Sequence, residues 1–212
     1  MKNRIMKCSV VALGFVFFVP VVAHAQDFQR VSFGADVTAW LTPNLDDFAM
    51  ALAADGAIEE FEIDDSVLYG MRPFVRFGLI RQFDLELSHE FAFGDDADAM
   101  VSAASGIWRP FGKSGLELHA SICYGQFDWN GPGDFESTWG WEIGAGYNLP
   151  LLETVTLVFG VAYRDITLDF KEDELLEDLA ETRPEVVTTV SFSETDVDTA
   201  GVVASAGVMV TF

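Results

Sequence analysis

The end of the chain, residues 198–212, alternates between two faces with a period of two. One face is apolar throughout, and the other carries small, polar and a few apolar residues. The apolar face consists of Val202, Ala204, Ala206, Val208, Val210 and Phe212. This period is typical of a β-strand that separates two environments. The pattern therefore predicts a terminal strand that ends on an aromatic residue.

The same alternation recurs in seven earlier segments, which we expect to be strands as well. They are residues 31–41, 67–79, 83–93, 99–111, 116–125, 139–149 and 155–164. Eleven residues at ~3.3 Å each, tilted by ~40°, cover roughly 25 Å, the height of the apolar band of an outer membrane. In segment 99–111 neither set of alternate residues is cleanly apolar. There we expect Met100, Ala104 and Trp108 to face outward and Arg109 to face inward.

The connections between these strands are alternately long and short. The long ones span residues 42–66, 126–138 and 165–196, and the short ones lie near 80, 113 and 151. Thr42 and Pro43 are typical of the start of a helix, and Leu45, Phe48, Met50 and Leu52 follow them. An acidic stretch from 171 to about 181 precedes Pro184. We therefore expect short helical turns in two of the long loops.

The first 25 residues have the pattern of a cleavable secretory signal peptide. A basic start precedes an apolar run over 10–22, and Ala23-His24-Ala25 forms a small-residue cleavage site before Gln26. The run is shorter than the ~20 residues of a spanning helix, which disfavours a retained anchor. We expect one domain over residues 26–212. Its Cys123 would be the last cysteine left, so no intramolecular disulfide could form.

The chain is strongly acidic, which restricts its partners. Its net charge is −22, and loss of three positive charges with the signal peptide would bring it to −25. Such a charge argues against nucleic acid and against anionic headgroups as direct partners, unless divalent cations bridge the two. The acidic loops match no known calcium-loop spacing, so we interpret them as solvated charge and predict no metal site and no cofactor.

The aromatic residues fall into two bands when the strands are placed side by side. If the first strand rises from the short-turn side, one rim receives Tyr69, Phe91, Phe93, Tyr124, Trp139, Trp141 and Tyr163. The other rim receives Phe77, Phe83, Tyr147 and Phe212. Two such girdles are typical of a transmembrane β-barrel. The alternative, a soluble barrel with its apolar face around a ligand cavity, is disfavoured by the small, glycine-rich polar face.

Charged residues on the inward faces are the first candidate site. A turn centred on Arg81 places Arg76 opposite Glu86 and Arg72 opposite Glu90, which predicts two stacked ion pairs. With Glu142 and Arg164 they would form a lumenal charge network. An eight-stranded barrel is just wide enough for side chains to fill, so we interpret the network as structural. The alternative is a charged constriction in a narrow pore.

A second candidate combines His119 and Ser121, two residues apart, with Glu142 on the neighbouring strand. The set resembles that of outer-membrane lipid A deacylases. That family follows its His-x-Ser with Asn, whereas here Ile122 and Cys123 follow, and the strand period places the pair in the lumen. We therefore expect a polar core histidine and an inert Cys123, and predict no catalytic residue.

Across nearly the whole predicted mature chain, the strand pattern and the Phe212 ending resemble the small bacterial outer-membrane barrels. These are outer-membrane protein A's barrel and its eight-stranded, OmpW-like relatives. The resemblance implies an all-β, antiparallel, up-and-down transmembrane barrel in a Gram-negative outer membrane. It also implies that the barrel assembly machinery reads the ending formed by Val208, Val210 and Phe212. Outer-membrane lipids and lipopolysaccharide would be its other partners.

The resemblance leaves three functions open. The first is a structural or surface-interaction role through the acidic external loops, with slight pore activity. The second is a narrow channel for small or apolar solutes. The third is an outer-membrane lipid-modifying enzyme.

Overall fold

The computed structural model describes residues 30–42, 45, 48–54, 57–111, 115–131, 133–171, 175, 187–192 and 196–212. The predicted signal peptide, residues 1–25, lies outside this part of the chain. The described residues form twelve strands: β1 (Arg30–Leu41), β2 (Ala49–Ala54), β3 (Ala57–Glu62), β4 (Val67–Ile80), β5 (Phe83–Phe93), β6 (Ala97–Trp108), β7 (Gly115–Trp129), β8 (Thr138–Pro150), β9 (Val155–Asp169), β10 (Val187–Phe192), β11 (Asp196–Asp198) and β12 (Gly201–Thr211). Within them, no helix is long and apolar enough to span a membrane.

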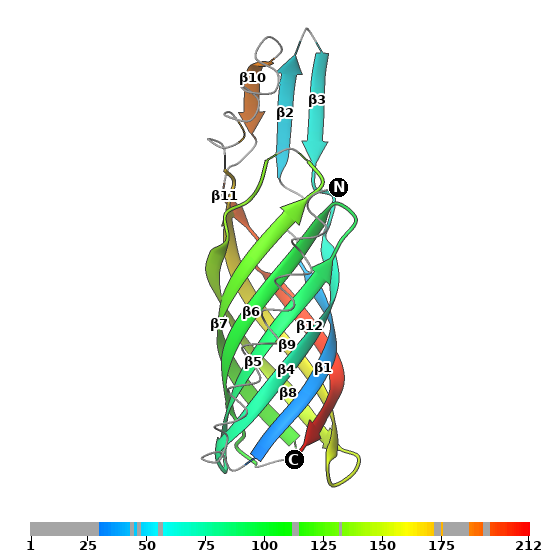
Figure 1. Cartoon of the computed structure of the whole chain (residues 1–212), viewed down its shortest axis with the longest axis vertical. Coiled ribbons are helices and arrows are strands. Elements are labelled where there is room, and N and C mark those ends of the chain that lie inside the picture. Colours follow the sequence, from blue (N-terminus) through cyan, green and yellow to red (C-terminus); the bar gives the residue numbers. More distant parts are fainter. Residues whose placement is uncertain are drawn as a thin grey trace.

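Eight of these strands close into an antiparallel barrel (Figure 1). Their order is β1, β4, β5, β6, β7, β8, β9 and β12, and β12 pairs back onto β1 from Ser32–Thr211 to Leu41–Val202. Each strand pairs with its predecessor in the barrel, so the topology is up-and-down. Closure leaves no sheet edge in the wall of the barrel. The predicted eight-stranded barrel is confirmed.

The two faces of each barrel strand have the predicted chemistry. Most apolar side chains on the outer face are exposed, as at Val37 (65%) and Ile122 (63%). On β4, however, the outward residues Val75 and Phe77 are each only 1% exposed, so the prediction that Phe77 lies in an exposed girdle is wrong. Polar side chains on the inner face are buried, as at Asp36 and Glu142. In β6, Trp108 is exposed and Arg109, just after the strand, is buried, so the prediction for this segment is also confirmed. The wall of the barrel is therefore apolar outside and polar inside.

The predicted loops at one end are in large part strands, which corrects the sequence-based interpretation. β2 and β3 pair as a hairpin where helical structure was expected, and β10 adds to β2 to complete a three-stranded sheet. This sheet extends beyond the barrel in Figure 1, above β6 and β7. Phe48 and Met50 are two residues apart, which is the strand period. Among the residues of 42–66 that the structure describes, a helical element is present only at Leu45, whose N–H donates to the Thr42 carbonyl over 3.1 Å.

Two barrel strands also run further than predicted at this end. β7 continues to Trp129 and β9 to Asp169, and β11 pairs with the far end of β9. Of the helix expected over 171–181, the structure describes one turn, in which Leu175 N–H donates to the Lys171 carbonyl over 3.2 Å. The rest of that prediction lies outside the described residues.

Candidate functional site

The lumen is filled by layers of side chains, and the layer nearest the short turns is centred on Asp84. This carboxylate at the start of β5 accepts hydrogen bonds from Arg30 of β1 at 3.0 Å and from Arg109 at 2.7 Å. Its side chain is fully buried. Arg30 and Asp84 lie on different strands and Arg109 directly follows a third, β6, so the layer connects three parts of the wall across the interior at that end of the barrel.

Arg76 organises the next layer. It donates to Glu86 on the neighbouring β5 at 2.7 Å and to Glu117 on β7 at 2.8 Å. Asn148 of β8 also donates to Glu117. The predicted Arg76–Glu86 ion pair is present. The Glu117 contact was missed because its partner lies across the lumen, and strand periodicity reports only which face a residue is on.

Arg164 and Arg72 organise the third layer, and here the predicted pairing of Arg72 with Glu90 is wrong. Arg72 contacts Asp36 of β1 at 2.8 Å and Glu142 of β8 at 3.7 Å. Glu90 instead pairs with Arg164 of β9 at 2.6 Å, on the opposite wall, and Arg164 also contacts Glu142 at 2.7 Å. Long side chains in a narrow barrel reach across it, so cross-strand register alone does not decide their partners.

We call these three layers the charged zone. Its members are Arg30, Asp36, Arg72, Arg76, Asp84, Glu86, Glu90, Arg109, Glu117, Glu142 and Arg164. The cavity found within it has a volume of about 30 Å³, with Asp36, Arg72 and His119 among its lining residues. That volume suits a single water molecule.

His119 and Ser121 lie inside the charged zone, as the strand period predicts. His119 Nε2 is 3.3 Å from Glu142 Oε1, and the Ser121 hydroxyl donates to Ser105 over 2.9 Å. Cys123 on the same strand is fully buried. Ser121 and His119 thus contact different partners, and neither side chain reaches the outer wall.

A second zone of buried aromatic side chains fills the other end of the barrel, and we call it the aromatic zone. The transition from charged to aromatic side chains begins at Trp40. Its ring lies 4.7 Å from the Arg164 guanidinium and packs edge-on against Phe127. Beyond it, the rings of Phe48, Trp129, Phe135 and Phe170 form a cluster with centroids 5.1 to 6.2 Å apart.

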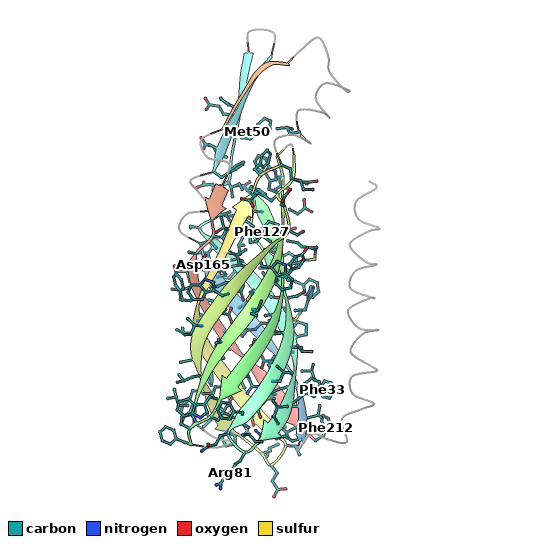
Figure 2. The ribbon with its side chains drawn as sticks, turned by 90° about the vertical axis from the view of Figure 1, so that its left-hand side faces the viewer. Phe33, Met50, Arg81, Phe127, Asp165 and Phe212 are labelled. Atoms are coloured by element: carbon teal, nitrogen blue, oxygen red, sulfur yellow. The ribbon has the colours of Figure 1, made fainter. Side chains whose placement is uncertain are left out.

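The aromatic zone was missed by the sequence analysis because its residues, apart from Trp40, fall in segments interpreted as loops. The signal that could have found it was the local density of aromatic residues in 126–138 together with Phe48 and Phe170. In Figure 2, Phe127 lies near the base of the projecting sheet and Met50 lies higher on that sheet, at the end opposite Arg81. The zone therefore joins the barrel to the sheet.

At the end of the barrel that carries the projecting sheet, Asp65 binds the β5–β6 turn. Its buried carboxylate accepts hydrogen bonds from the backbone N–H groups of Asp95, Asp96 and Ala97, over 2.7 to 2.8 Å. Within the described ranges, no three His, Cys, Asp or Glu side chains are arranged to hold a metal ion.

The outer wall carries the predicted girdle residues. Tyr69, Phe93, Trp139, Trp141 and Tyr163 are 44 to 70% exposed, and Phe91 and Tyr124 are half-buried. The Tyr124 and Trp139 rings are 5.1 Å apart, and those of Trp141 and Tyr163 are 5.7 Å apart. At the opposite end, Phe212 is 80% exposed and packs edge-on against Phe33 at 6.0 Å, while Val210 and Val208 pair with β1.

No protein-family model and no curated protein sequence matches this chain. Among solved structures, the outer membrane protein OprG from Pseudomonas aeruginosa matches with a TM-score of 0.53 and 15% identity, over 89% of this chain and 98% of OprG. The N-terminal β-barrel domain of Pseudomonas aeruginosa OprF matches with 0.50 and 13%, over 88% and 100%. The outer membrane protein AlkL, solved in lipid bilayers, matches with 0.50 and 12%, over 86% and 90%. At these identities the likeness concerns the fold.

Proposed function

We propose that this chain, which has the fold of the small eight-stranded outer-membrane barrels, is a closed Gram-negative outer-membrane barrel that presents an acidic sheet at the cell surface. Its role is structural or interactive and does not involve catalysis. The exposed apolar wall and its aromatic rims support a location in the membrane, because an open face of this kind is unfavourable in water.

The filled lumen is the observation that carries this proposal. The charged zone crosses the barrel with short ion pairs, and the aromatic zone occupies the outer end. A passage would have to break buried ion pairs, and leaving one partner uncompensated costs roughly 3–5 kcal/mol. Steady conduction is therefore not expected of the native barrel.

The sheet of β2, β3 and β10 is the proposed interaction surface. Exposed carboxylates lie on β3 at Glu60 and Glu62, and the aromatic zone fixes the base of the sheet. Divalent cations would bridge such carboxylates to lipopolysaccharide phosphates, and a basic surface would bind them directly. We also propose that the assembly machinery reads the exposed Phe212 with Val210 and Val208.

Single-channel recording of the purified barrel in planar bilayers tests the closed state. We expect no steady openings from the native chain. Quenching of the outward-facing Trp139 and Trp141 by brominated lipid acyl chains in the same preparation proves insertion. Steady openings of the native chain that Arg72→Ala or Arg76→Ala reduces would contradict the closed state and support a pore.

An epitope inserted between Ala54 and Ala57 tests the orientation. Antibody should bind it on intact cells. The same epitope inserted at Arg81 is the matched control and should become accessible only after the outer membrane is opened. The reverse result would contradict display of the sheet at the cell surface.

A channel for small apolar solutes is the second candidate. The apolar character of the aromatic zone favours it over a channel for ions, but Phe48 and Trp129 would have to move aside. A lipid-modifying activity at His119 is disfavoured by its burial in the lumen. An unchanged lipid A mass profile after His119→Ala would remove that activity.

A further inference from the structure

The outer wall carries a polar pair that the charged zone does not include. His89 of β5 and Ser102 of β6 are cross-strand partners, and His89 Nδ1 and Ser102 Oγ share a hydrogen bond of 2.8 Å. The imidazole packs edge-on against Phe91, with centroids 4.5 Å apart, which fixes the ring. Ser102 is exposed and His89 is half-buried. Both side chains point away from the lumen.

This pair lies in the middle of an otherwise apolar strip. On β5, Phe91 and Phe93 separate His89 from one end of the strand. Three outward residues, Phe83, Leu85 and Leu87, separate it from the other end. If the wall faces lipid, as the proposed function requires, hydrocarbon surrounds this pair and offers it no hydrogen-bond partner. A polar residue at such a position indicates an interaction site.

The pair does not satisfy its own hydrogen-bonding capacity. Its bond uses Nδ1 of the ring, and among the described residues Nε2 has no partner. The Ser102 oxygen can still take part in a second bond. Toward the rim, the outward residues Met100 and Asp98 separate Ser102 from the end of β6, and its partner on β7 is the girdle residue Tyr124. A second molecule that contacts the wall at this depth would supply the missing partner.

The surface beside the pair is small and open. Below Ser102, the outward residues of β6 are Ala104 and Gly106, both exposed, and Gly106 lies opposite the exposed Ala120 of β7. A Cβ built on Gly106 would meet nothing within 4 Å. Small residues let a second backbone approach closely within a membrane, and polar side chains then bond across the contact.

We propose that the wall formed by β5 and β6 is the contact surface for a second copy of this chain. In a two-fold arrangement, His89 Nε2 of each copy bonds to Ser102 of the other, so one patch satisfies both pairs. Ala104 and Gly106 set the close approach. The inference rests on the proposed membrane location.

Cysteine crosslinking in lipid vesicles tests this contact. Ala104→Cys, treated with a short bismaleimide at high dilution in lipid, should give covalent dimers. Val208→Cys is the matched control, because it is outward and 44% exposed on β12, on the side of the barrel opposite β6. The native Cys123 is fully buried and should not react. Equal crosslinking at both positions, or none at Ala104→Cys, would overturn the proposal.

A second set of variants tests the chemistry of the contact. His89→Leu with Ser102→Ala removes two reciprocal bonds and should weaken dimerisation about tenfold, measured by subunit counting in vesicles. Ala104→Trp should prevent the contact and give monomers. Unchanged dimerisation in both variants would contradict the proposal.

A label at Ile122 separates failure of this inference from failure of the proposed function. The residue faces outward in the middle of β7, and a fluorophore on Ile122→Cys should be quenched by brominated lipid acyl chains. Quenching without dimers removes the inference and leaves the membrane location standing. An unquenched label removes both.

Discussion

The charged zone and the aromatic zone fill the same lumen by opposite means. In the charged zone, few groups are held by directional contacts that cross the barrel, so each residue depends on a particular partner. In the aromatic zone, rings contact several neighbours without direction, and the residues come from connections as well as from barrel strands. The first zone ties the barrel walls together, and the second attaches the projecting sheet. Mutations in the charged zone should therefore destabilise the whole barrel, whereas mutations in the aromatic zone should destabilise mainly the projecting sheet.

Loss of Arg164 should have the largest effect, because this residue pairs with Glu90 and Glu142 and also covers Trp40. Arg164→Ala leaves two carboxylates buried without this partner and should lower the free energy of unfolding of the whole barrel by about 3–5 kcal/mol. Urea unfolding in vesicles measures it. Arg81→Ala, at an exposed turn, is the control. A loss near that of the control would show that Arg164 does not link the walls.

Loss of Phe48 should have a smaller and local effect. Phe48→Ala removes a ring that contacts Trp129, Phe135 and Phe170, which costs about 3 kcal/mol, and the cost should fall on the sheet alone. Hydrogen exchange should speed up in β2 and β3 and stay unchanged in β5. Phe48→Leu keeps much of the volume and should lose less. Faster exchange throughout the barrel would contradict this expectation and show that the two zones unfold as one cooperative unit.

Loss of Asp65 should be smaller again. Asp65→Ala removes the acceptor for three backbone N–H groups and should destabilise the β5–β6 turn by about 2 kcal/mol. Asp65→Asn retains one acceptor oxygen and should keep part of this. Limited proteolysis near Asp96 measures how far the turn is destabilised. Equal cleavage of the two variants would argue that the Asp65 carboxylate does not hold the turn in place.

A rise in salt concentration should have the smallest effect on the stability of the barrel. The ion pairs of the charged zone are buried, as at Glu90 and Arg164, so raising ionic strength from 0.1 to 1 M should change the unfolding free energy by less than about 0.5 kcal/mol. A steep salt dependence would mean that water reaches the pairs.

The sequence predicted well what depends on local period. Alternation along β12 and β7 assigned their faces, because a strand between lipid-like and polar surroundings must alternate at every residue. It also brought Arg76 to Glu86, which are neighbours across a tight turn. Arg72 was assigned the wrong partner because a contact with Asp36 or Glu142 depends on the curvature of the closed barrel. The projecting sheet was missed because Phe48 and Met50 follow a helix-start signal, and only the packing against Trp129 favours the strand.

The pairing of β1 with β12 joins residues near 35 to residues near 208. The first strand has no partner on one side until the last strand has been delivered. Folding in chain order therefore cannot complete the cylinder until the last strand forms, and before then the sheet exposes two unpaired strand edges whose closure spans nearly the full chain. Those two edges are open to pairing with other chains for as long as β12 is not in place.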